Sequence, residues 1–494
     1  MGVVVLGAIM SILDITVVNV ALPTFQTVFG TTGHPIAYST VAWTMTAYTL
    51  ALAAVIPLTG WAADRFGTKR LYMLSLTLFV LGSVLCATAW SIEALIGFRV
   101  IQGLGGGMLM PLGMTIMTHA AGPQRVGRVM AVLGVPMLLG PILGPILGGW
   151  LIQSASWHWI FLINVPIGIA ALIYAYVVLD KDSPEPSQSF DFLGMLLLSP
   201  GLALFLYGVA SIPEAGTVAS AKVLVPGLIG LALVVAFVFH ALHRKDHPLI
   251  DLRLFRNRQL SVAVITMSLF AIAFFGAMLL LPSYFLQVRG ETTLAAGLLL
   301  APQGLGAMVT MPIAGRLTDK MGPGKWVIAG LVLLVGGLAV FTQITSTTSY
   351  VLLLGALFVM GMGMGMTMMP IMSAALATLS HDSVARGSTL MNIIQQSAGS
   401  IGTAVMSVIL TNQVFDRPAA ATYMGVLQGQ IPPEQAPPGL ATAGPAALAD
   451  AFGSTFVVAL ILTALCLIPA FMLPRKAPAL PAGVDAASPA LPMH

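Results

Sequence analysis

Charged residues are scarce in this chain of 494 residues. Aspartate, glutamate, lysine and arginine together make up 8% of it, whereas a soluble globular protein carries about 25%. So few charges exclude a soluble protein of this size, and they also exclude disorder, because disordered chains are polar and highly charged. The net charge of +4 is not gathered into a basic patch, which excludes a nucleic-acid partner.

Cysteine is rarer still, and two common catalytic motifs are missing. Cys86 and Cys466 lie in separate apolar runs, so we expect neither a disulfide framework nor a cysteine-ligated metal. The chain has no Gly-x-x-x-x-Gly-Lys-Ser/Thr loop for ATP and no His-Glu-x-x-His motif for zinc. His240, His243 and His247 share a helical spacing, but we interpret them as solvated residues near a membrane surface. We therefore expect no enzymatic activity, no metal and no cofactor.

Apolar runs of about 20 residues fill most of the chain, and its mean hydropathy is +0.95. Such runs match helices that cross a bilayer, whereas the strands of a membrane barrel would be about half as long and would alternate. We predict an all-α polytopic membrane protein. Its fourteen transmembrane helices are expected over residues 2–22, 39–62, 71–90, 94–118, 128–152, 158–179, 191–211, 222–242, 259–285, 295–315, 326–344, 349–372, 388–413 and 451–473.

Basic residues gather in alternate loops between these spans. Of the 21 lysines and arginines, seventeen fall in one set of loops, three in the other set, and Arg99 lies within a span. Basic loops stay in the cytoplasm, so we expect both termini there, in a bacterial-type cytoplasmic (inner) membrane. The first span carries Asp14 and lacks a basic leader, so we do not expect a cleaved signal peptide.

Two loops that lie 255 residues apart share one pattern. Residues 60–70 and 315–325 both read Gly-x-x-x-Asp-basic-x-Gly-x-x-basic, which indicates two related halves of six spans each. We predict an N-terminal half over 1–180, an inserted pair of helices with a loop over 181–258, a C-terminal half over 259–474 and a cytoplasmic tail over 475–494. The Pro-rich segment near 414–450 is expected to be an external loop, and a docking surface for an outer adaptor protein is the alternative.

These motifs resemble the major facilitator superfamily. The 60–70 loop is similar to the family signature between its second and third helices, and the inserted pair resembles the fourteen-helix drug:proton antiporters of EmrB/QacA type. Residues 13–23, 99–103 and 157–166 carry the same resemblance, although Thr68 and His158 stand where the family commonly has basic residues. The span over 128–152 fits the antiporter signature through Gly140, Gly144, Pro145, Gly148 and Gly149.

The resemblance implies a major facilitator fold whose halves give alternating access to a central cavity. It implies proton-coupled efflux of amphipathic drugs or other hydrophobic compounds, cationic or neutral, with the proton gradient as the energy source. Protons, such small molecules and membrane lipid would then be the partners. A lipid exporter or flippase on the same fold is the alternative, and a membrane receptor or enzyme would be a different class.

Asp14 and Arg99 are the carboxylate and the basic residue that we place deep in the spans. A charge at such depth costs about 2.5–3.5 kcal/mol on insertion scales and usually marks an ion path. Their depths, about 13 Å and about 8 Å from the outer surface, allow the long arginine side chain to reach the carboxylate. We expect the pair to couple transport to protons, and a static ion pair that joins two helices is the alternative.

The two related loops are expected to form a cytoplasmic gate that closes and opens with the cavity. The alternative is a basic membrane anchor with a tight turn. The residues assigned to the gate are Gly60, Asp64, Arg65, Gly67, Arg70, Asp319 and Lys320. Three glycines of the 128–152 span share one face, which predicts a dry, bent contact between the halves, or simply close helix packing.

Polar, aromatic and methionine side chains within the spans are the expected walls of the cavity. Methionine adapts to varied ligands, but it also fills protein cores, and amides inside a membrane often join helices. The residues assigned to the substrate cavity are Asn19, Tyr48, Gln102, Phe270, Phe274, Met362, Met366, Asn392 and Gln396.

Overall fold

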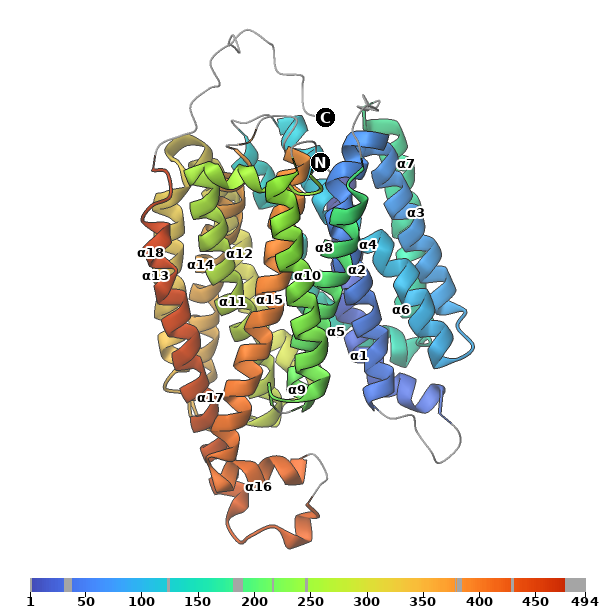
Figure 1. The fold of residues 1–494 in the computed structure, drawn as a ribbon. Helices are drawn as coiled ribbons and strands as arrows, with labels where there is room; N and C mark the ends of the chain where they lie inside the picture. The colour runs from blue at the N-terminus through green and yellow to red at the C-terminus, as the bar shows by residue number, and fades with distance from the viewer. Residues whose placement is uncertain are drawn as a thin grey trace.

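The computed structural model describes residues 2–30, 38–121, 125–180, 190–215, 217–244, 248–377, 379, 384–427 and 431–475. Every regular element in these ranges is a helix, and the long helices run side by side in one bundle (Figure 1). Thirteen of them are long and apolar enough to cross a membrane. The fourteenth long helix, α5, has 29 residues. The predicted all-α membrane fold is therefore confirmed.

The helices follow the chain in three groups. The first group comprises α1 (Gly2–Val28), α2 (Tyr38–Phe66), α3 (Thr68–Ala87), α4 (Ile92–Ala121), α5 (Val126–Ser154), α6 (Trp159–Leu162) and α7 (Asn164–Val178). The second comprises α8 (Phe192–Ala210), α9 (Ile212–Ala215) and α10 (Ala221–His243). The third comprises η1 (Leu252–Arg256), α11 (Arg258–Gln287), α12 (Thr293–Met321), α13 (Pro323–Phe341), α14 (Tyr350–Leu376), α15 (Val384–Phe415), α16 (Pro418–Leu427), η3 (Pro433–Gln435), α17 (Leu440–Leu465) and α18 (Leu467–Ala470).

The loops over 60–70 and 315–325 lie at the same end of the bundle, which we call the motif end. Helices α2 and α12 end there, whereas α1, α11 and α15 begin there because successive long helices run in opposite directions. Helix α16 lies beyond the bundle at the opposite end (Figure 1). This polarity tells which part of each helix faces which side of the membrane.

The first and third groups pack mainly within themselves, and the inserted helices α8 and α10 pack against each other. Helix α8 also contacts α2 of the first group and α15 of the third. Ile56, Leu202, Phe237 and Ile393 form one buried cluster across these four helices. The inserted pair therefore covers one seam between the first and third groups. The predicted domain boundaries stay a prediction.

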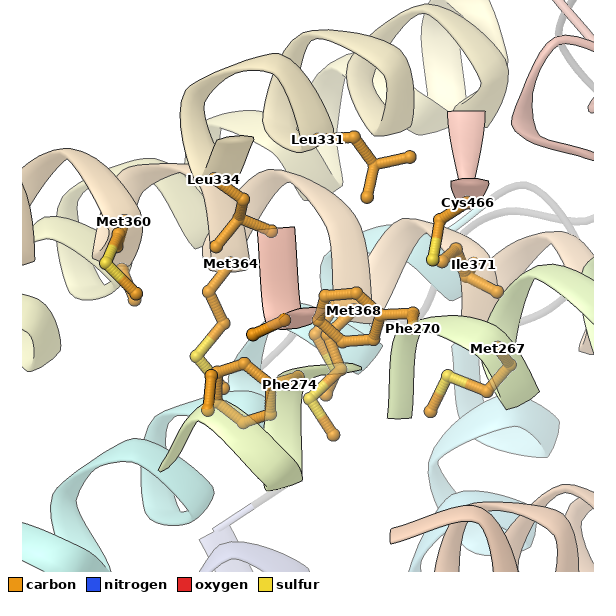
Figure 2. Packing of buried hydrophobic residues seen from close by; sticks show 14 of the residues in the cluster. Met267, Phe270, Phe274, Leu331, Leu334, Met360, Met364, Met368, Ile371 and Cys466 are labelled. Atoms are coloured by element: carbon orange, nitrogen blue, oxygen red, sulfur yellow. The ribbon is translucent and has the colours of Figure 1, made fainter. Parts of the chain in front are cut away.

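Close packing of α14 against its neighbours organises the third group. Methionines of α14 gather with aromatic residues of α11 and leucines of α13 (Figure 2). A Cβ atom at Gly361 would lie 1.9 Å from the carbonyl oxygen of Gln303, and one at Gly363 would lie 2.5 Å from that of Gly330. Lipid is as apolar as these side chains, so such dense contact, rather than escape from water, holds the helices together.

The segment near 414–450 contains more helix than the predicted loop. Helix α16 occupies Pro418–Leu427, and α17 begins at Leu440 rather than near residue 451. A Cβ at Gly444 of α17 would lie 2.6 Å from the Tyr423 ring, so α16 packs closely on α17. Proline at the first position of a helix needs no N–H partner, which makes Pro418 compatible with a helix start.

Candidate functional site

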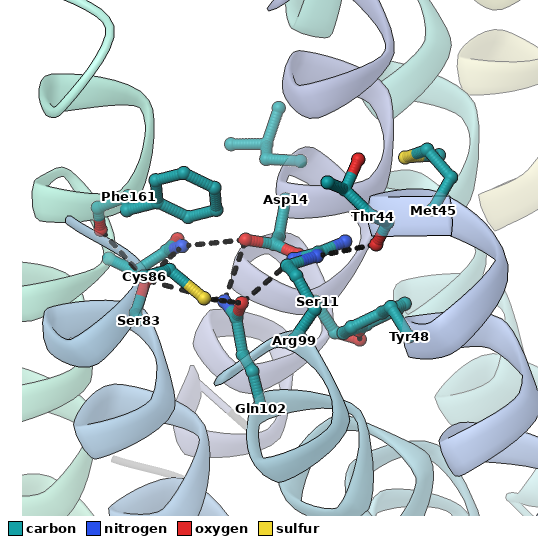
Figure 3. Close-up of polar contacts among 12 residues, drawn as sticks. Ser11, Asp14, Thr44, Met45, Tyr48, Ser83, Cys86, Arg99, Gln102 and Phe161 are labelled. Atoms are coloured by element: carbon teal, nitrogen blue, oxygen red, sulfur yellow. Dashed lines mark hydrogen bonds and ion pairs between the residues drawn. The ribbon is translucent and has the colours of Figure 1, made fainter. Parts of the chain in front are cut away.

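Asp14 of α1 and Arg99 of α4 form an ion pair inside the first group of helices (Figure 3). Arg99 Nη1 lies 2.5 Å from Asp14 Oδ2, and both side chains are 0% exposed. Arg99 Nε donates to the carbonyl oxygen of Thr44 at 3.1 Å, and the guanidinium carbon lies 4.1 Å from the centre of the Tyr48 ring. Breaking such a pair is costly, because either charge alone would be left without compensation away from water.

Two amides complete the surroundings of the carboxylate. Gln102 Nε2 and Asn164 Nδ2 both donate to Asp14 Oδ1, at 2.7 Å and 3.1 Å. Ser83 Oγ accepts from both amides, and Gln102 Oε1 accepts from Arg99 at 2.7 Å. Hydrogen-bond donors therefore reach both carboxylate oxygens of Asp14. Sequence reasoning did not assign Asn164, although a polar residue within the apolar run 157–166 was the available signal.

A cavity of ≈ 850 Å³ lies between the first and third groups of helices. Its walls come from α1, α2 and α4 on one side and from α11, α12, α14 and α15 on the other. On α11 the lining residues run from Phe274 to Leu286, and on α12 from Ala296 to Gly304, which are the halves remote from the motif end. The cavity therefore extends from the middle of the bundle toward the end opposite the motif end.

Tyr48 lies between the ion pair and the cavity. Its ring stacks on Arg99, and its hydroxyl lies 3.4 Å from Oγ of Ser11, which lines the cavity. Tyr48 itself is 0% exposed. A Cβ at Gly106 would lie 2.5 Å from the Tyr48 hydroxyl, so the missing side chain at this position leaves room for the tyrosine. One hydrogen-bonded layer thus separates Asp14 from the cavity.

At the motif end, α15 contacts α2 and α4 and closes the cavity. Asp64 Oδ2 accepts from Arg386 Nε at 3.3 Å, and these side chains are 15% and 14% exposed. Two residues further along α15, Ser388 Oγ lies 3.0 Å from Thr115 Oγ1. A Cβ at Gly60 would lie 3.3 Å from the Arg386 Cα, so the glycine permits this approach of two backbones.

The related loop makes the matching contact on the other side. Asp319 Oδ2 accepts from the backbone N–H of Arg128, in the first turn of α5, at 3.1 Å. Gly67 and Gly322, which hold equivalent positions in the two loops, have φ of 93° and 84°. Residues other than glycine rarely adopt such a positive φ, so the tight turn in each loop explains why both positions are glycine. Each loop of the repeat therefore places an aspartate against the other group of helices.

A family model described as Major Facilitator Superfamily matches residues 4–403, which is most of the bundle just described. The chain belongs to the major facilitator superfamily. The Multidrug resistance protein B homolog of Mycobacterium tuberculosis (strain ATCC 25618 / H37Rv) is 49% identical over 491 residues, which cover 96% of this chain and 89% of that relative. The Multidrug export protein EmrB of Escherichia coli (strain K12) is 30% identical, with 83% and 79% covered.

Solved structures of the superfamily share this fold. The human organic anion transporter MFSD10 (TETRAN) matches 94% of this chain and 98% of its own with a TM-score of 0.63. The proton:xylose symporter XylE matches 94% of each chain with a TM-score of 0.57. Their sequence identities are 18% and 16%, so this likeness concerns the fold alone. The predicted family is confirmed.

In this major facilitator protein, four of the nine predicted cavity residues line the cavity. They are Asn19, Phe274, Asn392 and Gln396. Tyr48 and Gln102 do not, because both are 0% exposed and face the ion pair. Phe270 lies deeper than its stacking partner Phe274 and is 1% exposed.

The methionine prediction for α14 chose the wrong face of the helix. Met364 and Met368 line the cavity, whereas the predicted Met362 and Met366 do not. A Cβ at Gly330 of α13 would lie 2.9 Å from the Met366 Cβ, so Met366 faces α13. Both pairs are four residues apart, and a helix with a methionine at nearly every second position gives no signal to choose between them.

The signature glycines of α5 face α1, whereas α5 meets the opposite half through other residues: it packs on α12 and α14, and a Cβ at Gly134 would lie 2.4 Å from Met311 of α12. A Cβ at Gly140 would lie 2.1 Å from Ile12, and one at Gly144 would lie 2.1 Å from Thr16 Oγ1. A Cβ at Gly148 would lie 3.2 Å from the carbonyl oxygen of Val17, and one at Gly149 would meet nothing within 4 Å. The side chain of Pro145 lies outside the described residues.

The remaining predicted gate residues lie at the motif end. Arg70 and Lys320 are exposed, and Arg65 is half-buried. Their cations suit the membrane anchor that was the alternative interpretation, whereas the two aspartates contact the opposite half. The two interpretations therefore apply to different residues of the same loops.

Of the histidines near the motif end, His240 contacts a buried carboxylate, whereas His243 is exposed. His240 Nε2 lies 2.8 Å and Arg244 Nη1 lies 3.0 Å from Asp191 Oδ1, whose side chain is 1% exposed. Burial raises the pKa of Asp191, but hydrogen bonds from His240 and from backbone N–H groups, including that of Leu249, outweigh this and hold it below its ordinary value. No group of three or more potential metal ligands occurs among the described residues, and His247 lies outside them.

Proposed function

We propose that this protein is a proton-driven exporter of amphipathic, hydrophobic compounds that works by alternating access. The observation that carries the proposal is a cavity of drug-sized volume separated by one layer of side chains from a sealed aspartate–arginine pair. Relatives named for multidrug resistance and multidrug export, at 49% and 30% identity, support the substrate class. The fold supports transport rather than enzymatic chemistry.

Alternating access follows from the contacts at the motif end. The basic loops predict that the motif end faces the cytoplasm and that both termini lie on the cytoplasmic side of a cytoplasmic membrane. The described conformation then faces outward, since its cavity lies toward the opposite end and the Asp64–Arg386 pair closes the inner side. Opening inward requires that pair and the Ser388–Thr115 contact to break, so the two loops act as the inner gate.

Proton coupling is assigned to Asp14. Protonation would remove its charge, which frees Arg99 from its partner and weakens the stack on Tyr48. Tyr48 reaches the cavity wall through Ser11, so the state of the pair changes the wall that a substrate touches. A bound substrate and a bound proton thereby favour different arrangements of the same residues, which is the requirement for exchange.

The decisive experiment measures transport by the purified protein in liposomes with an imposed pH gradient. We expect gradient-driven transport of a hydrophobic dye that stops when an ionophore collapses the gradient. Asp14→Asn should abolish the gradient-driven component, whereas Asp416→Asn, at an exposed carboxylate just beyond α15, should retain it.

Dye transport that ignores the gradient would overturn proton coupling. Gradient-driven movement of a fluorescent phospholipid analogue, without movement of the dye, would assign the protein to lipid export instead. Both assays use the same vesicles, so a difference between them cannot come from a difference in the amount of folded protein.

A further inference from the structure

We propose that the cavity selects uncharged compounds that carry several hydrogen-bonding groups, and that it selects against permanent cations. This inference rests on the proposed function only in taking the cavity as the substrate site. It narrows the substrate class, which the fold and the sequence motifs leave open between cationic and neutral compounds.

The described walls of the cavity contain no charged side chain. Of the 31 described residues that line it, none is aspartate, glutamate, lysine, arginine or histidine. A permanent cation that enters loses hydration, and a wall without a carboxylate offers no opposite charge in return. An uncharged compound loses far less on leaving water, so the same wall favours it.

Asp14 does not act as the missing counter-ion. Its carboxylate is 0% exposed, and the layer formed by Tyr48 and Ser11 separates it from the cavity. Both of its oxygens already accept hydrogen bonds, from Arg99 on one side and from two amides on the other. The positive Arg99 beside that carboxylate also repels a cation in the cavity. At a distance this repulsion cancels the attraction of Asp14.

The walls do contain unused hydrogen-bonding groups. The side-chain amides of Asn19, Gln303, Gln395 and Gln396 line the cavity, and none forms a hydrogen bond to another described residue. The amide of Asn392, in contrast, donates to the carbonyl oxygen of its own helix at position 388, at 2.8 Å. The four unpaired amides come from α1, α12 and α15, so they approach a ligand from different walls.

Apolar side chains provide the rest of the surface. Phe274, Met364 and Met368 lie among the amides, and methionine side chains adapt to ligands of different shape. Amides present both a donor and an acceptor, which match the carbonyl, hydroxyl and amide groups of a neutral molecule. A few polar groups set in an apolar wall are the usual design of a small-molecule site.

The test compares two probes that share the same ring skeleton and differ in charge. Ethidium is a permanent cation, and dihydroethidium is its uncharged reduced form with the same two amino groups. Binding to the purified protein in lipid nanodiscs, corrected with empty nanodiscs, is measured without a proton gradient. We expect dihydroethidium to bind at least about tenfold more tightly than ethidium when both are compared at the same neutral pH.

A reversal of selectivity provides the second measurement. Gln396→Glu places one carboxylate on the wall, so we expect ethidium to gain about tenfold in affinity and dihydroethidium to lose affinity. The matched control, Gln343→Glu, lies on an exposed turn after α13 and should change neither value.

Two results would overturn the inference. One is ethidium binding to the unmodified protein as tightly as dihydroethidium, which needs no variant to fold. The other is selective loss of ethidium binding in Asp14→Asn, which would make that carboxylate the counter-ion. Because binding is measured without a gradient, a preserved neutral preference with no proton-driven efflux would refute the proposed function alone.

Discussion

Replacing Asp14 with asparagine removes the carboxylate that pairs with Arg99 and leaves that guanidinium buried. Both side chains are 0% exposed, and removing one partner of such a pair costs about 3–5 kcal/mol. Gln102 and Asn164 both donate to Oδ1, so the oxygen of the introduced amide stays there and keeps those two hydrogen bonds. Its nitrogen then faces Arg99, donor against donor. We therefore expect a loss of about 3 kcal/mol in the free energy of unfolding.

A second substitution tests whether the uncompensated charge causes this loss. Adding Arg99→Gln to Asp14→Asn removes both charges, so the double variant should be more stable than Asp14→Asn alone by about 2 kcal/mol. The free energy of unfolding is measured for both single variants and the double variant by titrating detergent-solubilised protein with dodecyl sulfate. Asp416→Asn, at an exposed carboxylate, should stay within about 0.5 kcal/mol of the unmodified protein.

Additive losses in the double variant would refute the reasoning, since they would show that the two charges do not depend on each other. Unchanged stability of Asp14→Asn would refute it as well, because a paired, buried carboxylate cannot be neutralised without consequence.

Three further predictions concern other parts of the fold. Asp64→Asn should slow export of every substrate, because its partner Arg386 loses a charge-assisted hydrogen bond of about 1.5 kcal/mol. The ratio of inward-open to outward-open protein, measured by spin-label distances across the motif end, should rise about tenfold. Gly144→Ala should destabilise the protein by about 1–3 kcal/mol through overlap with α1, whereas Gly149→Ala, which meets nothing within 4 Å, should be neutral. Because the pKa of Asp191 is lower in the folded protein, its carboxylate stabilises the fold at any pH above its unfolded pKa of about 3.9. This stabilisation disappears as the pH falls through the folded pKa. Asp191→Asn should therefore flatten the acid side of a plot of stability against pH.

Each of these has a contrary outcome. Loss of a single substrate in the gate variant would place that aspartate in substrate binding. Equal effects of the two alanine substitutions would show that the α1–α5 contact yields easily. An unchanged acid profile in the third variant would mean that the carboxylate keeps its ordinary pKa in the folded protein.

Much of the fold could be predicted because lipid imposes a simple rule on length and composition. Apolar runs of sufficient length predicted each long helix, and the cost of a charge in the membrane predicted that Asp14 and Arg99 would meet. The supporting amides were harder to assign, since their role depends on which face of α4 and α7 turns toward the pair. Gln102 was assigned to the cavity for this reason, and Asn164 was not assigned to the site at all.

The predictions based on composition were wrong where tertiary packing determines the local structure or the neighbouring helix. The segment near 414–450 is rich in proline, yet α16 forms there because Tyr423 packs against Gly444 of α17. The glycines of α5 signalled close approach correctly, but a spacing of four residues does not name the neighbour. That neighbour proved to be α1, through Ile12 and Thr16.

If Asp14 carries the coupled proton as proposed, the aspartate–arginine pair also determines how the membrane voltage acts on this protein. While the pair is intact, its two charges sum to zero, so a conformational change that carries both through the membrane does no electrical work. Under the proposed coupling, a proton on Asp14 leaves the net charge of Arg99, and moving one such charge across the membrane is worth about 2.3 kcal/mol per 100 mV. Because neither the described residues of the cavity wall nor an uncharged substrate adds charge to this sum, we expect the voltage to drive the proton-loaded step of the cycle and the substrate-loaded step to depend on chemical gradients alone.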